Sequence, residues 1–354
     1  MSAISNTTLN TIALTLGVSR TTAHAALSGS GRVSEATRKR VCDLAAELGY
    51  TPNMVARALR TQRTGNIALV VPTIGAPHMA LILRGIEEYA TTQGYNILLA
   101  CAHGKAHKER ELMEAFLGLG VEGLLLYTDC YYYPRECLDR IVKKVPLVLL
   151  ENTIADMHLD MVGVDQFAMG VTAGELLRAH GRRQQGYLLP YPSVRGQWST
   201  LRAAGQQQAA QQDGDVSCAI LGETATEDAL TVAYVMQALQ DHYAAGKPLD
   251  GLFAANDEHA YLAIHALQTL GLRVPEDVAV IGCDDHVGSD TFTVPVTTFQ
   301  QPMEALGWNA GELLFRRMNE QTAQPPTQDL LPASLIVRAS CGAQLAMDSC
   351  VPNR

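Results

Sequence analysis

The sequence predicts two parts: an all-α N-terminal helix-turn-helix segment followed by a short helix, and an α/β core of two subdomains with parallel sheets. Apolar residues repeat at helical spacing through residues 9–48. From residue 66 onwards, short apolar runs alternate with helical stretches, as in βαβ units. The chain of 354 residues is long enough for two or three compact units.

Charge separates the two parts. The chain has a formal net charge of −9, but residues 1–64 carry +5 and residues 65–354 carry −14. A basic segment can bind phosphate groups locally even when the rest of the protein is acidic. The pattern is therefore compatible with a nucleic-acid partner for the N-terminal part.

Three features predict the compartment. The opening MSAISNTTLN has neither a basic n-region nor an apolar h-region, so we expect no secretory signal. No uncharged apolar run approaches the ~18 residues of a membrane span. The eight cysteines are scattered without a CxxC pair, which is typical of reduced thiols. We expect a cytoplasmic, nucleoid-associated protein with no membrane partner.

Three helices are predicted within the first fifty residues. The first has an apolar face at i, i+3, i+4 and i+7, formed by Leu9, Ile12, Ala13 and Leu16. Gly17 ends this helix and Ser19 caps the next one. Ser34 can cap a third helix, which Gly49 stops. Two short helices across a glycine turn, braced by a third, form a helix-turn-helix.

The second helix has two distinct sides. Its apolar side consists of Ala23, Ala26 and Leu27, and its outward side consists of Arg20, Thr21, His24 and Ala25. In a helix-turn-helix the N-terminal residues of the second helix face base edges in the major groove. Any small three-helix bundle shows the same periodicity, however, and Arg38-Lys39-Arg40 could simply be a solvated face. Periodicity alone leaves both interpretations open.

A further short helix follows the bundle. Pro52 breaks the chain, and Asn53 can cap a helix that ends near Leu59. Isolated helices shorter than ~12–15 residues are marginal in water, so this helix needs a partner surface. DNA could provide that surface, with Leu59 wedged into the minor groove.

Three motifs in register decide between these interpretations. They are GVSxxT (Gly17 to Thr22), VSxxTRxRV (Val33 to Val41) and LGYxPNxxARxL (Leu48 to Leu59). Together they resemble the DNA-binding headpiece and hinge of the LacI/GalR family of bacterial regulators. The similarity continues through 255–285, 296–307 and 335–340, to about residue 341. It implies a core similar to periplasmic binding proteins.

The resemblance implies DNA-binding roles for ten residues. Arg20 and Thr21 occupy the positions that usually select bases. The positions that mainly cap helices and hold phosphates are Ser19, Thr22, Ser34 and Thr37. The hinge positions are Asn53, Ala56 and Leu59, with Leu59 as the minor-groove wedge. The usual arginine is replaced by Ala25, so we expect Arg20 and His24 to carry more of the base recognition. An Arg–guanine pair is worth ~1–3 kcal/mol of discrimination.

The sequence predicts four segments: a headpiece over residues 1–50, a hinge helix and linker over 51–64, a two-lobed effector-binding and dimerisation core over 65–341, and a tail over 342–354. The expected core strands are Ile67–Val71, Asn96–Cys101, Gly123–Tyr127, Leu147–Leu150, Tyr187–Leu189, Leu252–Ala255 and Val278–Gly282. Their near-continuous apolar character predicts parallel sheets covered on both faces. Similarity between VEGLLLY (121–127) and LDGLFAA (249–255) predicts two similar lobes.

Polar residues mark a candidate effector site. Ligands of open α/β sheets bind beyond the carboxyl ends of the strands. The resemblance adds Arg202 as the effector-anchoring arginine, and the chemistry of the set suits a sugar or related polyol. The predicted effector-binding residues are His78, Tyr127, Glu151, Trp198, Arg202, Asn256 and Asp284.

Several of these residues have structural alternatives. Asn256 and Asp257 could cap the following helix. Trp198 could stack on a sugar face or pack in the core. Asp285 is expected to make a loop or subdomain contact. The tyrosines of 127–134 could line the cleft rim or cover a subunit surface.

No catalytic or metal site is predicted. His103 and His107 lack further ligands at a usable spacing, so we expect a solvated loop. Asp284 and His286 lie within one loop, where neighbouring side chains rarely converge. No GxSxG, Walker or GxGxxG motif is present, so neither an enzyme nor a cofactor is expected.

We therefore expect a DNA-binding transcriptional regulator, most simply a repressor, that binds a pseudo-palindromic operator on double-stranded DNA as a homodimer. A small sugar-like effector would control it from the cleft between the lobes. The alternatives are a solute-binding protein or a sugar-active α/β enzyme with a vestigial headpiece. Departures from the family pattern at Leu262, Cys283 and Gln300 leave the effector unnamed.

Overall fold

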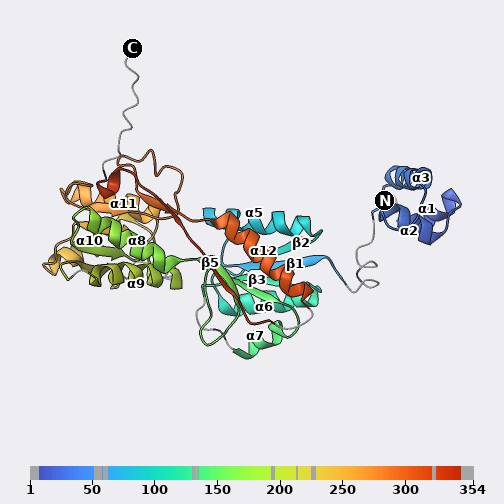
Figure 1. Ribbon diagram of the computed structural model, residues 1–354, viewed down its shortest axis with the longest axis horizontal. Coiled ribbons are helices and arrows are strands. Elements are labelled where there is room, and N and C mark those ends of the chain that lie inside the picture. Colours follow the sequence, from blue (N-terminus) through green and yellow to red (C-terminus); the bar gives the residue numbers. More distant parts are fainter. Residues whose placement is uncertain are drawn as a thin grey trace, which may run out of the picture. The chain divides into compact units, whose positions relative to one another are not determined.

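The computed structural model describes residues 8–51, 58, 63–129, 133, 135–192, 196–212, 214–224, 229–320 and 324–343 (Figure 1). The chain divides into two compact units, residues 1–64 and 65–354, which are considered separately. Within the described ranges, no helix is both long and apolar enough to cross a membrane.

The first unit contains three helices: α1 (Leu9–Leu16), α2 (Arg20–Leu27) and α3 (Glu35–Glu47). They bury a small common core, formed by Ile12, Ala13, Ala23, Ala26, Val41 and Ala45. The apolar spacing along each helix predicted this core. The predicted helix-turn-helix is therefore confirmed.

Short polar side chains determine where these helices begin. The hydroxyl of Ser19 accepts a hydrogen bond from the Thr22 backbone N–H at 3.0 Å, and Ser34 accepts from that of Thr37 at 3.3 Å. Gly17, at φ +65°, adopts the left-handed conformation that ends α1. The predicted caps are confirmed. The hinge residues Asn53, Ala56 and Leu59 lie outside the described residues, so the hinge helix stays a prediction.

The N lobe of the second unit is built on a six-stranded parallel sheet in the order β11-β5-β4-β3-β1-β2. Its strands are β1 (Asn66–Val71), β2 (Asn96–Cys101), β3 (Leu124–Tyr127), β4 (Leu147–Leu150), β5 (Asp160–Val164) and β11 (Gln328–Leu331). Helices α5 (Pro77–Thr92) and α12 (Met303–Asn319) cover one face, and α6 (Ala106–Gly118) and α7 (Arg135–Val142) cover the other (Figure 1).

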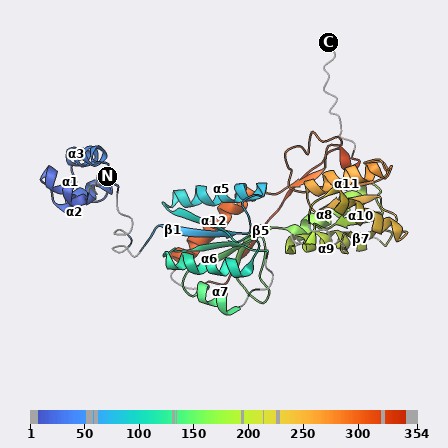
Figure 2. The same ribbon diagram turned by 180° about the vertical axis from the view of Figure 1, so that it is seen from behind.

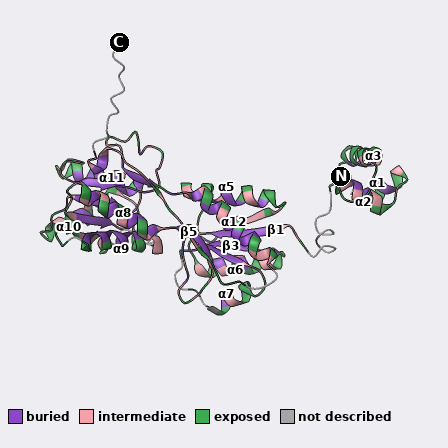
Figure 3. Cartoon of the chain, in the orientation of Figure 1, coloured by how far each residue is buried: buried purple, intermediate pink, exposed green. Residues whose placement is uncertain are grey.

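The C lobe is built on a four-stranded parallel sheet in the order β7-β6-β8-β9. Its strands are β6 (Gln184–Leu188), β7 (Ser217–Leu221), β8 (Gly251–Ala254) and β9 (Ala279–Ile281). Helices α8 (Gln166–Ala179) and α9 (Gln197–Gln211) cover one face, and α10 (Val232–Ala244) and α11 (Asp257–Thr269) cover the other (Figure 2). The buried sheets form the cores of both lobes (Figure 3).

The strand orders of the two lobes correspond. The series β2-β1-β3-β4 in the N lobe repeats as β7-β6-β8-β9 in the C lobe. The similar segments 121–127 and 249–255 contain β3 and β8, which occupy the same place in the two series. The two similar lobes predicted from this similarity are therefore confirmed.

The chain passes between the lobes at three places. β5 leads directly into α8, and β10 (Thr298–Gln300) leads back into α12. The third passage joins β11 to β12 (Ser334–Ile336), which pairs antiparallel with β10; the short 3-10 helix η2 (Ala339–Cys341) follows. As a result α12, which follows the C lobe in sequence, packs against α5 of the N lobe.

Glycines allow one close helix pair in each lobe. In the C lobe, a Cβ on Gly170 would collide with the carbonyl oxygen of Arg202, and one on Gly205 with that of Phe167. In the N lobe, Gly85 and Gly307 stand in the same relation across α5 and α12. In each helix pair the two backbones are therefore in direct contact at these glycines, where no side chain would fit.

Candidate DNA-reading and effector-binding sites

The N-terminus of α2 presents the predicted base-reading residues. Arg20 and Thr21, the first two residues of the helix, are exposed. The Ser19 hydroxyl lies 2.8 Å from that of Thr22, so these two side chains are engaged with each other at the cap. His24 is half-buried one turn further along. Free N–H groups and an exposed guanidinium at a helix N-terminus suit an anionic, hydrogen-bonding partner.

The basic run of α3 divides into two roles. Arg38 Nη1 donates to the carbonyl oxygen of Ala26, 3.3 Å away in the last turn of α2. This contact satisfies a helix end that would otherwise lack a partner. Lys39 and Arg40 remain exposed. Arg38 therefore supports α2, and only its two neighbours form a solvated face.

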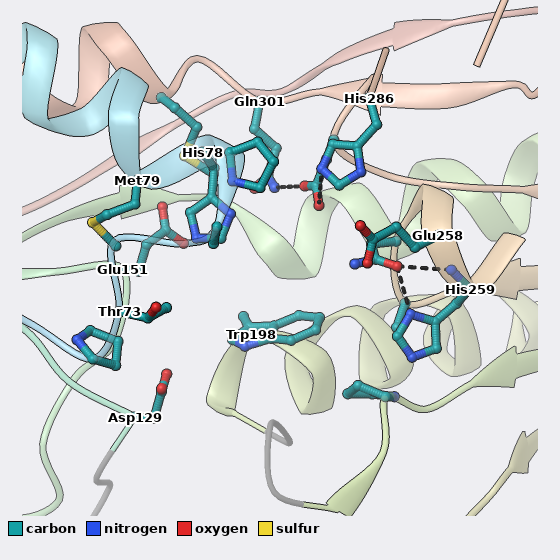
Figure 4. A pocket seen from close by; sticks show the side chains of 18 of the residues that line it. Thr73, His78, Met79, Asp129, Glu151, Trp198, Glu258, His259, His286 and Gln301 are labelled. Carbon is teal, nitrogen blue, oxygen red and sulfur yellow. Dashed lines mark hydrogen bonds and ion pairs between the residues drawn. The ribbon is translucent and has the colours of Figure 1, made fainter. Parts of the chain in front are cut away.

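A cavity of about 350 Å³ lies between the N and C lobes (Figure 4). Its N-lobe wall includes Thr73, Met79 and Asp129, and its C-lobe wall includes Glu258 and His259. All the residues predicted to bind the effector line this cavity: His78, Tyr127, Glu151, Trp198, Arg202, Asn256 and Asp284. They come from opposite lobes and from distant parts of the sequence.

Arg202 is buried in the wall of the cavity, 3% exposed. Its Nε donates to Gln166 Oε1 at 2.7 Å, and its Nη1 donates to the Ala255 carbonyl oxygen at 2.6 Å. The guanidinium lies 4.8 Å from the centre of the Trp198 ring, a cation–π distance. Trp198 is half-buried, so it belongs to the cavity wall and not to a core.

Gln166 joins the charged groups of the two lobes. Its Nε2 donates to Glu151 Oε2 at 2.9 Å and to Gln301 Oε1 at 3.1 Å. Gln301 Nε2 in turn donates to Asp284 Oδ1 at 2.5 Å. A continuous hydrogen-bonded chain therefore runs from β4 through two of the passages to the loop after β9.

Glu151 ends this chain in an unusual state. Burial raises the pKa of its carboxyl to about 7, although Gln166, Arg202 and a backbone hydrogen bond from Val164 partly oppose the rise and Asp284 adds to it. The backbone of Glu151 lies in the left-handed region, at φ +66°. Its Oε1 atom is buried and has no hydrogen-bond partner within the described structure. Strained backbone and an unpaired buried acceptor are typical of ligand sites.

The structure resolves the roles of Asn256 and Asp257. Asn256 caps α11: its Oδ1 accepts from the His259 backbone N–H at 3.0 Å, while the residue also lines the cavity. Asp257 is buried, and its carboxylate accepts from Thr298, Ser289 and the His286 backbone N–H. Asp257 therefore ties α11 to β10 and to the loop after β9.

The loop after β9 sends its side chains in two directions. Asp285 accepts from Arg338 Nη2 at 2.7 Å, the loop contact expected for it. Asp284 and His286 both line the cavity, with His286 Nε2 3.6 Å from Asp284 Oδ2. The His286 ring is seen in the cavity wall in Figure 4. Our expectation that the side chains of this loop would not converge is wrong for this pair. Positive φ angles of 101° at Asp284 and 49° at Asp285 produce the arrangement.

Aromatic and histidine rings complete the walls. The His78 ring lies 6.3 Å from that of Tyr127, and burial lowers its pKa against the opposing effect of Asp284. The Tyr191 ring is stacked on His259, also at 6.3 Å. Tyr133 donates to the Ala106 carbonyl, and Tyr131 and Tyr132 lie outside the described residues.

Sequence analysis missed several lining residues: Thr73, Asp129, Gln166, Tyr191, Glu258, His259, His286 and Gln301. Gln166 follows the end of β5, so recognising that strand would have found it. Glu258 and His259 lie in the first turn of α11, which begins directly after the predicted residue Asn256. The described residues contain no cluster of three or more histidine, cysteine or acidic side chains suited to a metal.

Comparisons with known proteins agree with this architecture. Residues 8–53 match the bacterial regulatory proteins of the lacI family, and residues 175–341 match the periplasmic binding protein-like domain. The HTH-type transcriptional regulator GntR of Pseudomonas aeruginosa is 32% identical over 312 residues, which cover 87% of this chain and 88% of that protein. The chain belongs to the lacI family of bacterial regulatory proteins.

Other relatives of this lacI-family regulator extend the match. The HTH-type transcriptional repressor PurR of Pasteurella multocida is 28% identical over 350 residues, covering 96% of this chain and 99% of that one. The lac repressor dimer bound to operator and the anti-inducer ONPF shares the fold, with a TM-score of 0.81 at 23% identity over 96% and 100% of the two chains. The complex of the transcriptional regulator CelR with cellobiose has a TM-score of 0.66 at 27% identity, covering 94% and 99%.

The family assignment decides between the predicted functions. This lacI-family protein is a DNA-binding transcriptional regulator with a periplasmic-binding-protein-like core, and its relatives are regulators, not enzymes. The alternatives of an enzyme or a solute-binding protein with a vestigial headpiece are therefore set aside.

Proposed function

We propose that this regulator is a repressor that binds a pseudo-palindromic operator as a homodimer in the cytoplasm and releases or tightens it in response to a small sugar-like effector. One observation carries the proposal: the same chain has an exposed α2 N-terminus in its first unit and a polar cavity between the two lobes of its second unit. Relatives named as repressors support the direction of regulation.

The proposed DNA contacts are those of the headpiece, residues 1–50, and the hinge, residues 51–64. Arg20 and Thr21 read bases in the major groove, while Ser19, Thr22, Ser34 and Thr37 hold phosphates and cap helices. His24 takes part of the reading that the usual arginine would perform at Ala25. Asn53, Ala56 and Leu59 act at the minor groove.

A second copy of the chain is the proposed partner of the N lobe. β2 is an edge strand of the six-stranded sheet, with Leu99 on it 38% exposed. Leu81 on the neighbouring helix α5 is 39% exposed. Unpaired edges and apolar side chains gathered in one place are typical of protein interfaces. Two-fold pairing through this surface would give two headpieces for two half-sites.

The proposed effector site is the cavity in the core, residues 65–341, with residues 342–354 as a tail. Its carboxylates, amides and guanidinium suit several hydroxyl groups, and Trp198 suits the apolar face of a sugar. The complex of the relative CelR with cellobiose supports this choice. Binding would favour one arrangement of the lobes and so shift the hinge equilibrium on DNA.

In vitro selection from random duplex DNA, with the full-length protein at fixed moderate salt, tests the proposal. We expect a two-fold symmetric site whose binding changes when candidate sugars are added. Recovery of no sequence preference would contradict the operator-binding role, and an asymmetric single half-site would contradict the dimer.

A further inference from the structure

The polar atoms of the cavity point to the chemical class of its ligand, an inference that rests on the proposed effector role of this site. Three buried polar atoms in its walls lack a hydrogen-bond partner within the described structure: Glu151 Oε1, His259 Nε2 and His286 Nε2. His286 Nε2 faces the Asp284 carboxylate at 3.6 Å, so the acceptors left for a ligand are Glu151 Oε1 in the N lobe and His259 Nε2 in the C lobe. Glu151 is 7% and His259 is 2% exposed. An unsatisfied buried acceptor is costly, so a ligand that donates to it gains affinity.

The tautomer of His259 follows from its neighbour. Asn256 Oδ1 accepts from the His259 backbone N–H, which fixes the orientation of that amide. The same oxygen lies 2.6 Å from His259 Nδ1, so Nδ1 must carry the proton and donate. Burial lowers the pKa of His259 to about 4, which keeps the ring neutral. Nε2 is therefore an acceptor at neutral pH.

Gln166 fixes Glu151 in the same way. The Gln166 oxygen accepts from Arg202 Nε, so its nitrogen faces Glu151 and donates to Oε2. Oε2 is thus held as an acceptor, and any proton on this carboxyl must lie on Oε1. A ligand hydroxyl that donates to Oε1 would replace that proton.

Charge in the cavity opposes an anionic ligand. The described lining residues include four carboxyl groups, Asp129, Glu151, Glu258 and Asp284, and burial raises the pKa of Asp129 and Glu151; Arg202 is the one arginine or lysine among these residues. Arg202 already directs Nε and Nη1 to protein oxygens. The neutral His259 adds no positive charge. A carboxylate or phosphate would therefore meet hydrogen-bond acceptors and the carboxylates of Glu258 and Asp284, with Arg202 already engaged by protein oxygens.

We propose that the cavity binds an uncharged polyhydroxyl ligand, which donates hydroxyl hydrogen bonds to Glu151 Oε1 and His259 Nε2, and that it rejects sugar acids and sugar phosphates. Binding ionises Glu151 and releases its proton to solvent. Among the described residues, Arg202 on α9, Asp284 after β9 and Tyr127 at the end of β3 interact electrostatically with Glu151, and His78, Asp129 and His286 line the same cavity. The affinity of the ligand therefore increases with pH.

The first test uses matched probes with the full-length protein. Melting temperature and calorimetric affinity are measured for glucose, xylose and cellobiose, for the aldonate of each, and for glucose 6-phosphate. We expect at least one uncharged probe to bind, and to bind at least tenfold tighter than its acid. Tighter binding of an acid or phosphate overturns the inference, as does a panel in which no uncharged probe binds.

The second test follows the proton. Because Glu151 has a pKa of about 7, we expect release of about half a proton at pH 7, measured in two buffers of different ionisation enthalpy. Affinity should rise about tenfold between pH 6 and pH 8, since the ionised fraction rises by that factor around a pKa of about 7. Proton uptake, or an affinity that falls with pH, overturns the inference.

Two glutamate variants locate the proton. Glu151→Gln should abolish both the proton release and the pH slope. Glu109→Gln is the matched control, because Glu109 is also buried in the N lobe but does not line the cavity; it should keep both signals. If Glu151→Gln keeps the slope, the inference fails; if it does not fold, the wild-type proton measurement still decides. Operator binding by the same preparation separates failure of this inference from failure of the proposed function.

Discussion

Burial sets the chemistry of individual side chains in the cavity more than residue type does. Removal from water raises the pKa of Glu151 to about 7 and lowers that of His259 to about 4. Both shifts favour the uncharged form of the side chain. A site with several acids and histidines can thus carry less charge than its composition suggests.

The Glu151 carboxyl makes stability depend on pH. Its pKa is raised from 4.5 to about 7 by folding, so the native protein holds a proton that the unfolded chain has lost between these values. This contribution is complete below pH 4.5 and is lost as the pH rises through 7. We expect Glu151→Gln to gain stability relative to wild type between pH 5 and pH 8, by at most about 3 kcal/mol. Urea denaturation of both proteins across that range measures it, and a constant difference would contradict the prediction.

Arg20 is the residue on which we expect base preference to depend. In Arg20→Ala, discrimination at one symmetric pair of operator positions should fall by about 1–3 kcal/mol, because the guanidinium no longer reaches base edges. Selection from random DNA followed by competition binding measures this loss. Lys39→Ala is the control, since Lys39 is exposed on α3: it should weaken all sequences alike. Unchanged base preference in Arg20→Ala would show that other residues read the operator.

Residues of the candidate site were predictable where a recognised strand preceded them. Glu151 follows β4, Asn256 follows β8 and Asp284 follows β9, so strand ends located them. Gln166 follows β5, a strand that the sequence did not reveal. His286 required backbone angles in the left-handed region at the two preceding residues, which no local pattern of the sequence indicates.

At the scale of elements, glycine contacts hold each close helix pair together. In Gly170→Ala, the new methyl group meets the Arg202 carbonyl oxygen, so α8 and α9 must move apart. We expect a loss of about 1–3 kcal/mol in the free energy of unfolding. Gly118→Ala is the control, because that position on α6 has open space; it should gain about 0.4–1 kcal/mol. Chemical denaturation compares the two, and equal stabilities would contradict this account of the packing.

Strand prediction from the sequence succeeded where the strand itself is a continuous run of apolar residues. All the predicted strands are present, and β2 and β4 have the predicted bounds. The strands β5, β7, β10, β11 and β12 were not among the predicted ones. β10 is only three residues long, and β11 joins the sheet by pairing with β5, which is distant in the sequence. Such strands depend on partners and not on their own residues, which is why local patterns do not reveal them.

At the scale of the whole molecule, the exposed leucines of the N lobe should report on assembly. We expect Leu99→Glu to shift the protein towards monomer, because a charge replaces an apolar side chain on the edge strand β2. Operator affinity should then fall by about a hundredfold, since the two half-site contacts are no longer linked. Sedimentation velocity and operator titration measure both effects. Leu119→Glu, an exposed leucine after α6, should change neither; a dimeric Leu99→Glu protein would place the interface elsewhere.

The division of charge between the two units affects how the regulator finds its operator. Net positive charge, which attracts any DNA duplex, is confined to residues 1–64, at +5, while residues 65–354 have a net charge of −14, which phosphates repel. The non-specific affinity of the regulator for chromosomal DNA is therefore low, and fewer regulator molecules are bound at competing non-specific sites. A small number of copies per cell can then keep the operator occupied, because occupancy depends on the ratio of specific to general affinity.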